Sequence, residues 1–507
     1  MKKKIFLLKD LNKKIRNLQS RGKKIVQCHG VFDLLHIGHI KHFREAKTYG
    51  EILVVSITSD RFVNKGPNRP AFNQNLRAES LASLEYIDFV VINDNASAIP
   101  IIKSLRPNFY CKGPDYKIHK KDITGKIKTE ISAVKRFGGK IIYTKEETYS
   151  SSKLINIFTD NFTKTHKSNI KEIKKKYSYE KIINIFEKIK KTKVLVIGET
   201  IIDEYNFCEA LGKSGKEPTL VLRDLNKETY SGGAVAIARH LSPFLTNVSL
   251  LSMIGEKKEY LPKIKKDLPK NVNFDYIKKE NSPTIIKRRF LDHISKNKVL
   301  GVYSLNDDRL NNTNEKQFQK KLKKMLRQYD MVIVSDYGHG LISTKSAKMI
   351  CTNSKFLAVN AQLNASNIGF HSMRKYRNPN CVIINDRELR YELRDRNSPV
   401  TELMKKLCND QKINNLIVTM GTQGSIFYNK QKSSFFRNQA YEKNALDKIG
   451  AGDTMLALAS ICLHKKLSER LSLIIGSLGA AQSVRTIGNK TPIDKIEMLK
   501  TLEHLLK

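Results

Sequence analysis

The chain has 507 residues, of which 40% are hydrophobic and 28% charged, and its formal net charge at pH 7 is +43. This length predicts two or three globular domains of roughly 100–200 residues each. No apolar run reaches the ~18 residues of a membrane helix, and none resembles a signal peptide. We therefore expect a cytoplasmic protein without a membrane partner. Because the lysines are spread over the whole chain rather than clustered, anionic phosphate substrates explain the charge better than a nucleic-acid partner.

The first part of the chain predicts a parallel sheet. From Lys23 to about Tyr143, short β-branched runs alternate with helical patterns, as in strand–crossover–strand units. The expected strands are residues 24–27, 52–58, 89–92, 109–112 and 140–144. Residues 158–190 are polar, lysine-rich and helical in period, with no glycine or proline. We therefore expect a first α/β domain at 23–157 and a helical connector at 158–190.

A second α/β series follows the connector. The expected strands are residues 194–198, 331–335, 356–360, 381–385 and 416–419, and helices are expected near 453–463 and 471–485. The two series share no repeat period. The sequence thus predicts a second, unrelated α/β domain at 191–507.

Two histidines follow the first predicted strand. Gly30 provides a turn after this strand, and His36 and His39 then stand three residues apart at the start of a helix. Residues at i and i+3 share one helical face, and the helix N-terminus supplies donors for phosphate. Imidazoles so placed could donate hydrogen bonds to charge that develops on the phosphates during in-line displacement. Histidines on a surface or in a core remain the plainer alternative.

The surroundings of these histidines resemble the cytidylyltransferase-like superfamily over about residues 23–157. The matching segments are Phe32-Asp33-Leu34-Leu35-His36-x-Gly38-His39, Lys65-Gly66, Arg77-Ala78-Glu79, Lys112-Gly113-Pro114-Asp115-Tyr116 and Phe137-Gly138-Gly139. The resemblance implies a Rossmann-like nucleotidyltransferase with His36 and His39 as catalytic residues. It also implies a nucleotide site formed by Phe32, Asp33, Lys65, Arg77, Lys112, Ser150, Ser151 and Ser152.

Several alternatives stay open for this first site. Arg77 and the serines could instead cap helices. Pro114 stands where the related heptose-phosphate enzymes usually have glycine, which leaves the nucleotide, ATP or CTP, and the acceptor undecided. Class I aminoacyl-tRNA synthetases share the tetrapeptide His-Ile-Gly-His, but no Lys-Met-Ser-Lys-Ser-like partner is present.

A glycine-rich turn precedes a helix near the C-terminus. Asp447-Lys448-Ile449-Gly450-Ala451-Gly452-Asp453-Thr454 leads into an apolar helical run. Backbone amides at such a helix start suit a phosphoryl group in transfer, and Asp453 could accept the proton of the attacking hydroxyl. A tight turn with a favourable N-terminal charge is the alternative.

This segment resembles the signature of the ribokinase (PfkB) family, and further elements over about residues 191–495 follow in that family's order. These elements are Gly198 to Asp203, Ser231-Gly232-Gly233-Ala234, Ser335 to Gly340, Asn385-x-x-Glu388 and Thr419 to Gly424. The resemblance implies a ribokinase-like α/β fold, a Mg²⁺ cofactor and a homodimer through the kinase domain. Ala236 and Asn360-Ala361-Gln362 depart from the heptose kinases and leave the sugar open.

The resemblance also assigns residues to parts of the kinase site. Asp203, Gly232 and Gly233 would bind sugar, with Lys287 and Arg289 as contacts to a phosphate on it; a solvated basic face is the alternative for these two cations. Asn385 and Glu388 would organise Mg²⁺ indirectly. Thr419, Gly421 and Gly424 would line the ATP pocket, Gly450, Ala451 and Gly452 would form the anion hole, and Asp453 would be the base.

Together the two resemblances predict a bifunctional enzyme of nucleotide-sugar synthesis for surface polysaccharide or lipopolysaccharide. The kinase would phosphorylate a sugar or sugar phosphate with ATP, and the transferase would join a sugar 1-phosphate to a nucleotide from ATP or CTP. Two other hypotheses remain. The transferase could act on a polyol phosphate, or the first domain could be a non-catalytic module that binds nucleotide or polyanion.

Overall fold

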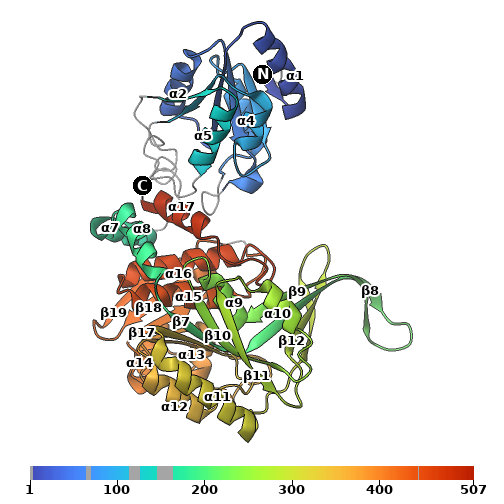
Figure 1. Ribbon diagram of the computed structural model, residues 1–507. Coiled ribbons are helices and arrows are strands. Elements are labelled where there is room, and N and C mark those ends of the chain that lie inside the picture. The colour runs from blue at the N-terminus through green and yellow to red at the C-terminus, as the bar shows by residue number, and fades with distance from the viewer. Residues whose placement is uncertain (1–3, 64–69, 114–125, 145–163, 443–444, 507) are drawn as a thin grey trace. The chain divides into compact units, whose positions relative to one another are not determined.

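The structure is a computed structural model that describes the chain except residues 1–3, 64–69, 114–125, 145–163, 443–444 and 507 (Figure 1). The chain divides into two compact units, residues 1–163 with 499–507 and residues 164–498. Both contain parallel sheets flanked by helices, which confirms the predicted α/β class. Within the described ranges, no helix is long and apolar enough to cross a bilayer.

The described part of the first unit contains a six-stranded parallel sheet in the order β1-β4-β3-β2-β5-β6. Its strands are β1 (Ile5–Phe6), β2 (Ile25–Gly30), β3 (Ile52–Thr58), β4 (Phe89–Asn93), β5 (Phe109–Lys112) and β6 (Lys140–Tyr143). Strands β2 to β5 are mostly buried, which explains why they appear in the sequence as continuous apolar runs. The chain order reverses between β2 and β5, and such a switch point opens a crevice at the carboxyl ends of the strands.

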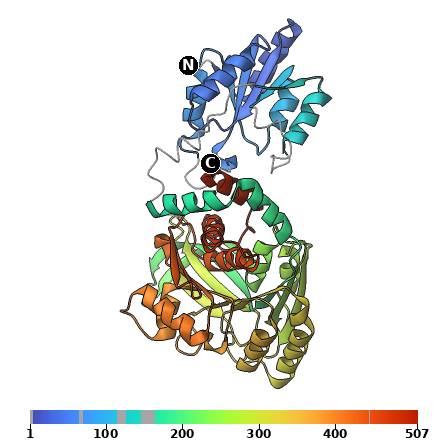
Figure 2. The ribbon, with the colours of Figure 1, turned by 90° about the vertical axis from the view of Figure 1, so that its left-hand side faces the viewer.

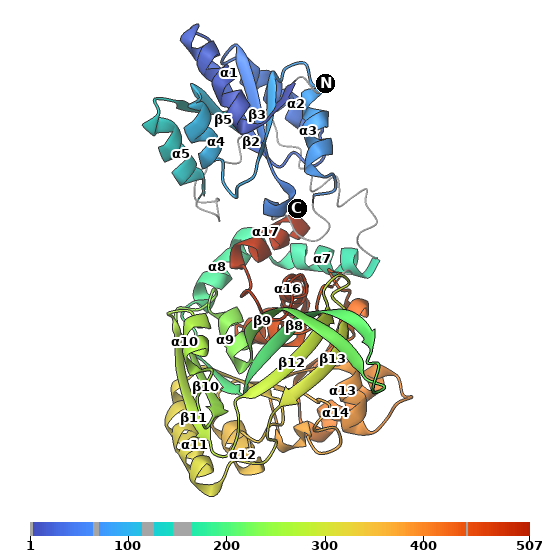
Figure 3. The same cartoon turned by 90° about the vertical axis from the view of Figure 1, so that its right-hand side faces the viewer.

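Helices cover both faces of this sheet (Figure 3). Helices α2 (Ile37–Lys47) and α3 (Gln74–Ala82) pack on one face. Helices α1 (Leu8–Ser20) and α4 (Ile99–Leu105) pack on the other, and α5 (Lys126–Arg136) contacts α4. Strand β1 pairs with β4, so this unit begins well before the expected boundary at residue 23. Two residues are too few to be recognised as a strand from sequence.

The second unit is built on a larger sheet, whose described strands have the order β11-β10-β7-β14-β15-β16-β17-β18-β19. The strands from β11 to β17 are parallel, and β18 and β19 are antiparallel additions at one edge. Their bounds are β7 (Val194–Gly198), β10 (Val248–Gly255), β11 (Val272–Lys279), β14 (Met331–Asp336), β15 (Leu357–Ala361), β16 (Cys381–Asn385), β17 (Asn415–Thr419), β18 (Ser425–Asn429) and β19 (Ser434–Asn438).

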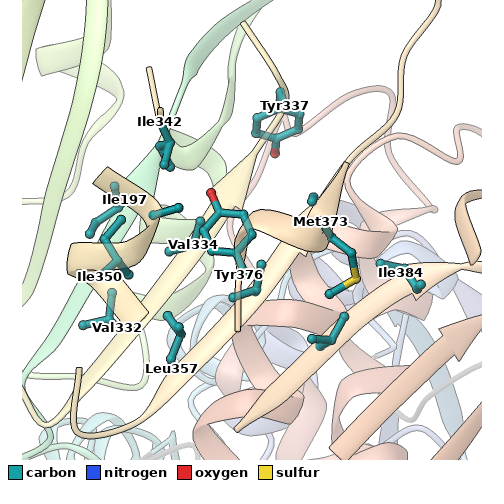
Figure 4. Packing of buried hydrophobic residues seen from close by; sticks show 14 of the residues in the cluster. Ile197, Val332, Val334, Tyr337, Ile342, Ile350, Leu357, Met373, Tyr376 and Ile384 are labelled. Atoms are coloured by element: carbon teal, nitrogen blue, oxygen red, sulfur yellow. The ribbon is translucent and has the colours of Figure 1, made fainter. Parts of the chain in front are cut away.

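Two layers of helices enclose this sheet (Figures 1 and 2). One layer contains α9 (Ala234–Leu241), α15 (Ala451–His464) and α16 (Glu469–Ser483). The other contains α11 (Asn312–Met325), α12 (Thr344–Asn353), α13 (Asp386–Leu393) and α14 (Val400–Gln411). Figure 4 shows part of the buried cluster, in which side chains of β7, β14, β15 and β16 meet α12. Helix α10 (Leu261–Asp267) also belongs to this unit, whereas α17 (Lys495–Leu506) extends beyond its last residue, Met498.

A separate four-stranded sheet projects from the second unit, in the order β13-β12-β8-β9 (Figure 3). Its strands are β8 (Thr200–Lys213), β9 (Leu220–Gly233), β12 (Ile285–Asp292) and β13 (Lys298–Ser304). Strand β8 follows β7 after a single residue, so the sheet grows directly out of the carboxyl end of a central strand. This sheet was not expected from the sequence, because charged residues interrupt the apolar runs of its strands and much of β9 and β13 is exposed.

The segment expected to connect the domains contains two helices, α7 (Lys164–Lys176) and α8 (Tyr179–Ile189). Asn169 Nδ2 in α7 donates a hydrogen bond to the Arg437 carbonyl at 2.7 Å. The Tyr177 hydroxyl accepts one from the Ser468 amide at 3.0 Å. These contacts join α7 and the residue that follows it, Tyr177, to the second unit.

Candidate functional sites

His36 and His39 lie together at the carboxyl end of β2. Their rings are stacked with centroids 3.9 Å apart. His36 is the N-cap of α2 rather than part of its first turn, because its Nδ1 accepts a hydrogen bond from the Gly38 amide at 3.1 Å. Phe32 has a positive φ of 47°, and its ring meets the His39 ring in a T-shaped arrangement with the centroids 5.4 Å apart. The histidine pair is therefore built by a cap and an aromatic wall, not by helical periodicity alone.

Arg77 holds the loops of this site and is not open to a ligand in this structure. Its side chain is 0% exposed and forms an ion pair with Asp60 at 2.6 Å. It also donates to three carbonyls, those of Val31, Thr58 and Phe72, at 2.6 to 3.0 Å. The contacts therefore differ from both sequence interpretations, a triphosphate ligand and a helix cap. The donors of Arg77 hold the ends of three segments in place.

Asp33, like Arg77, forms hydrogen bonds with the backbone of a loop at this site. It is 3% exposed, and its Oδ1 accepts hydrogen bonds from the amides of Ala71 and Phe72 at 2.7 and 3.1 Å. It thus fixes the chain that leads into α3. Lys65, Ser150, Ser151 and Ser152 lie outside the described residues.

Lys112 is the last residue of β5, the strand that pairs with β2, and it is 6% exposed. Its Nζ lies 3.1 Å from Oε2 of Glu130, which also accepts from the Tyr110 hydroxyl at 3.0 Å. Burial opposes ionisation of Glu130, but the Lys112 ammonium holds the pKa of Glu130 below its usual value. Burial, followed by the charge of Lys112, lowers the pKa of His42 to about 4, so His42 is neutral at physiological pH. The cation expected to meet phosphate is thus paired inside the protein.

The second site is centred on Asp453 in the first turn of α15. Gly450, the residue before this helix, has φ +88°, and a Cβ there would lie 2.1 Å from Oδ1 of Asn489. A Cβ on Gly452 would meet no atom within 4 Å, so this turn faces open space. Burial, with the nearby charge of Asp203, raises the pKa of Asp453 to about 6, although the Tyr337 hydroxyl and Lys287 oppose this rise. Asp453 is thus a partly buried carboxylate at an open helix N-terminus.

The projecting sheet supplies the neighbouring charges. Oδ1 of Asp203 on β8 accepts from Arg289 on β12 at 2.6 Å. A Cβ on Gly232 would lie 2.2 Å from Oδ2 of Asp203, and Gly233 has φ +62°. The structure therefore brings together the three predicted sugar-binding residues.

Lys287 is the second cation of this group, opposite Asp203 in the strand register. Lys287 and Arg289 are 7% and 9% exposed, which excludes the alternative of a solvated basic face. Burial lowers the pKa of Lys287. Its Nζ lies 5.7 Å from the ring centroid of Tyr337, and no described residue gives it a hydrogen bond or an ion pair. The charges of Asp203, Glu199 and Asp307 favour the ionised form, but none of them is in contact with the ammonium, so a buried cation of this kind is suited to an anionic ligand.

The predicted nucleotide residues lie along adjacent strand ends, since Asn385 on β16 is in register with Thr419 on β17. Asn385 and Glu388 form a capping box for α13, with both hydrogen bonds at 2.8 Å. Burial raises the pKa of Glu388 to about 7. Gly424 has φ +88°, and a Cβ there would meet the Asn438 carbonyl at 2.0 Å, whereas Gly421 at φ +58° faces open space. Among the described residues, no three or more His, Cys, Asp or Glu side chains are grouped to hold a metal ion.

Three residues to which the sequence assigned no role prove central to this edge of the sheet, namely Glu199, Asp336 and Lys375. Glu199, 0% exposed, accepts hydrogen bonds from the amides of Tyr337 and His339 at 2.9 and 3.2 Å. Burial, with the charge of Asp336, raises the pKa of Glu199 to about 7. Burial opposes ionisation of Asp336, but Lys375, whose Nζ lies 2.6 Å away, holds its pKa below the usual value. An acidic residue next to a buried parallel strand was the signal available.

Asp447, the first residue of the glycine-rich segment, links that segment to the projecting sheet. It accepts hydrogen bonds from Lys298 on β13 at 2.6 Å and from the Tyr205 hydroxyl on β8 at 2.7 Å. The Gly488 amide also donates to it, at 3.0 Å. The loop before Asp453 is therefore fastened on two sides.

Comparisons with known proteins agree with this division. Residues 191–496 match the pfkB family of carbohydrate kinases, and residues 28–157 match the cytidylyltransferase-like family. The chain is 41% identical over 139 residues to "Bifunctional protein HldE" of Aliarcobacter butzleri, which is 27% of this chain and 29% of that protein. It is 48% identical over 97 residues to the protein of the same name from Campylobacter fetus subsp. fetus, covering 19% of this chain and 21% of the relative.

The chain thus spans less than a third of the length of these curated relatives. Among solved structures, phosphofructokinase-2 from Escherichia coli in complex with potassium has a TM-score of 0.52 at 14% identity. That likeness covers 62% of this chain and 100% of the other, and it shows the fold alone. Because the pfkB match extends over more than half of its residues, the chain belongs to the pfkB family of carbohydrate kinases and also carries a cytidylyltransferase-like segment.

Proposed function

We propose that the chain is a bifunctional cytoplasmic enzyme of nucleotide-sugar synthesis. The second unit phosphorylates a sugar or sugar phosphate with ATP, and the first transfers a nucleotidyl group from ATP or CTP to a sugar 1-phosphate with release of pyrophosphate, as in ADP-heptose synthesis. The single observation that carries the proposal is Asp453, a carboxylate of raised pKa at an open glycine turn. The relatives' name, which describes two functions, supports the pairing of activities.

In the kinase, the acceptor hydroxyl loses its proton to Asp453 as it attacks the γ-phosphate. Asp203, Gly232 and Gly233 hold the sugar, and the amides of residues 450–452 stabilise the charge that grows on the phosphoryl oxygens. Lys287 and Arg289 contact a phosphate on the sugar. The buried, unpaired ammonium of Lys287 favours such an anionic sugar.

Mg²⁺ fits the nucleotide side of this site. Asn385 and Glu388 offer oxygen atoms, which Mg²⁺ prefers, and they already bond to each other's backbone. They therefore act on the ion through water and the ATP phosphates, while Thr419, Gly421 and Gly424 line the ATP pocket. When bound, the ion neutralises charge on the phosphates.

In the transferase, His36 and His39 donate hydrogen bonds to the charge that develops as the acceptor phosphate displaces pyrophosphate. Lys65, Phe32 and Ser150 to Ser152 contact the nucleotide. Lys112, which is paired with Glu130 in this structure, would have to turn away from that carboxylate to reach the phosphates. Asp33 and Arg77 do not touch the nucleotide, but their hydrogen bonds fix the loops that carry the contacting residues.

The kinase unit forms a homodimer through its four-stranded sheet. This sheet exposes many large apolar side chains, which favours contact with a second copy. They are Leu211, Leu220, Val221, Leu225, Val299, Leu300, Val302 and Tyr303. Sedimentation of the wild type beside Leu300→Asp tests the dimer, and a monomeric wild type refutes it.

The test of the two activities uses the full chain in three forms: wild type, His39→Ala and Asp453→Asn. Pyrophosphate release is followed with ATP or CTP and a panel of sugar 1-phosphates and polyol phosphates, and ADP release with a panel of hexoses, heptoses and their phosphate esters. His39→Ala should lose pyrophosphate release and keep the kinase activity, and Asp453→Asn should do the reverse. If no acceptor supports pyrophosphate release while the kinase is active, the first unit is a binding module and the bifunctional proposal fails.

A further inference from the structure

We propose that Tyr337 is the positioning residue of the base Asp453, whose Oδ1 it holds so that Oδ2 faces the acceptor hydroxyl. The inference rests on the proposed kinase function and adds a residue to it. The Tyr337 hydroxyl donates a hydrogen bond to Oδ1 of Asp453 at 2.7 Å. In the described part of the chain, no residue donates a hydrogen bond to Oδ2.

The tyrosine is rigidly placed within the core. It follows β14 directly and is 3% exposed. Figure 4 shows its ring in the same buried cluster as Ile342, Val334 and Tyr376. Close packing around the buried ring restricts its movement and holds the hydroxyl next to Asp453.

The backbone of Tyr337 is fixed as firmly as its ring. Its amide donates to Oε2 of Glu199 at 2.9 Å. Its carbonyl accepts from the side-chain amides of Asn364 and Asn367, both at 2.8 Å. Each polar group of the residue is therefore bonded, and two separate segments, at Glu199 and at residues 364–367, fix its backbone.

The hydrogen bond has an electrostatic consequence. A donor to a carboxylate stabilises the ionised form, whereas burial and the charge of Asp203 favour the protonated form. Tyr337 thus keeps the base ionised at a lower pH than its surroundings alone permit. Oδ2 accepts no hydrogen bond from a described residue and is left for the acceptor hydroxyl.

The test is Tyr337→Phe in the full chain, which keeps the ring and removes only the hydroxyl. The acid limb of the kinase kcat/KM profile should move upward by about one pH unit, since a charge-assisted hydrogen bond is lost. At pH 6 this shift corresponds to a loss of several-fold to about tenfold in rate, which recovers above pH 8. The KM for ATP should stay within about twofold of wild type, because no phosphate contact is removed.

Tyr376→Phe is the matched control. Tyr376 is 0% exposed in the same cluster, and its hydroxyl donates to Oδ2 of Asp336 at 2.6 Å. This change removes a buried tyrosine–carboxylate hydrogen bond without touching Asp453, so it should lower stability and leave the acid limb in place. If Tyr337→Phe moves the limb no further than Tyr376→Phe, the inference is wrong.

A second variant covers the case in which Tyr337→Phe does not fold. Site-specific difluorotyrosine at position 337 makes the phenol more acidic and a stronger donor, so the acid limb should move to lower pH; no movement overturns the inference. Asp453→Asn separates this outcome from failure of the proposed function. If Asp453→Asn loses kinase activity but the acid limb does not move in the Tyr337 variants, only the positioning role of Tyr337 is rejected. If Asp453→Asn remains active, the role of Asp453 as the base is rejected.

Discussion

Replacement of Gly232 by alanine tests the geometry of the sugar-binding residues directly. The new Cβ would lie 2.2 Å from Oδ2 of Asp203 and 3.3 Å from its Cγ. Non-bonded carbon and oxygen atoms need roughly 3.5 Å, so the carboxylate must move by about 1 Å or more. That movement breaks its 2.6 Å hydrogen bond to Arg289.

The size of the effect follows from the burial of this ion pair, whose side chains are 11% and 5% exposed for Arg289 and Asp203. Disruption of a buried pair costs about 3–5 kcal/mol. That cost falls on the stability of the fold, whereas displacement of Asp203 removes a charge-assisted hydrogen bond to the sugar of roughly 1.5–3 kcal/mol, or about ten- to a hundredfold. We expect a decrease of this order in kcat/KM for the sugar in Gly232→Ala, with the KM for ATP unchanged.

The assay measures ADP release at saturating ATP while the concentration of the active sugar is varied. Gly215→Ala is the control, because a Cβ there would meet no atom within 4 Å. Thermal unfolding of both variants shows whether the fold is intact. If folded Gly232→Ala retains kcat/KM for the sugar within about threefold of Gly215→Ala, Asp203 does not hold the substrate as we infer.

Three further predictions address the pH dependence of the kinase and the stability of the first unit. The pKa of Asp453 is raised to about 6, and only its ionised form accepts a proton. The kinase kcat/KM should therefore fall about tenfold per pH unit below pH 6. An acid limb of the profile near pH 4 would contradict this prediction. Glu130→Gln removes the carboxylate that neutralises buried Lys112 and should destabilise the first unit by ~3 kcal/mol in calorimetry. Asp94→Asn, in an exposed pair, should leave the stability almost unchanged, and equal effects of the two variants would refute the buried-pair account. Arg77→Lys keeps the charge but cannot serve four acceptors, so the first unit should lose ~2–4 kcal/mol, and unchanged stability would show that these bonds are unimportant.

The central strands could be predicted from sequence because they are buried on both faces. Residues 52–58, 109–112 and 381–385 were expected as strands, and the structure places β3, β5 and β16 there with the same bounds. The four-stranded sheet was not expected, because buried and exposed residues alternate along its strands and both kinds include charged side chains. In β12 the buried Lys287 and Arg289 alternate with the partly exposed Arg288, a pattern that looks like a charged surface when partners are unknown.

The candidate sites were predictable where one short segment determines the geometry. Gly450 and Gly424 have positive φ angles and close neighbours, so their motifs carry a local requirement for glycine. Arg77 could not be predicted in this way. Its four acceptors lie 46, 19, 17 and 5 positions away along the chain, and only the folded sheet brings them to one guanidinium.

The surroundings of Asp453 show how parallel topology assembles a site from distant segments. The hydrogen bond from Tyr337 to Glu199 joins residues 138 positions apart, and that from Tyr337 to Asp453 joins residues 116 positions apart. Glu199 follows β7 and Tyr337 follows β14, and these two strands are neighbours in the sheet. Since the carboxyl ends of parallel strands meet at one edge, a polar residue directly after a buried strand is a site candidate wherever it stands in the sequence. A conserved motif need not reveal such a residue, because its partner is determined by strand order rather than by spacing along the chain.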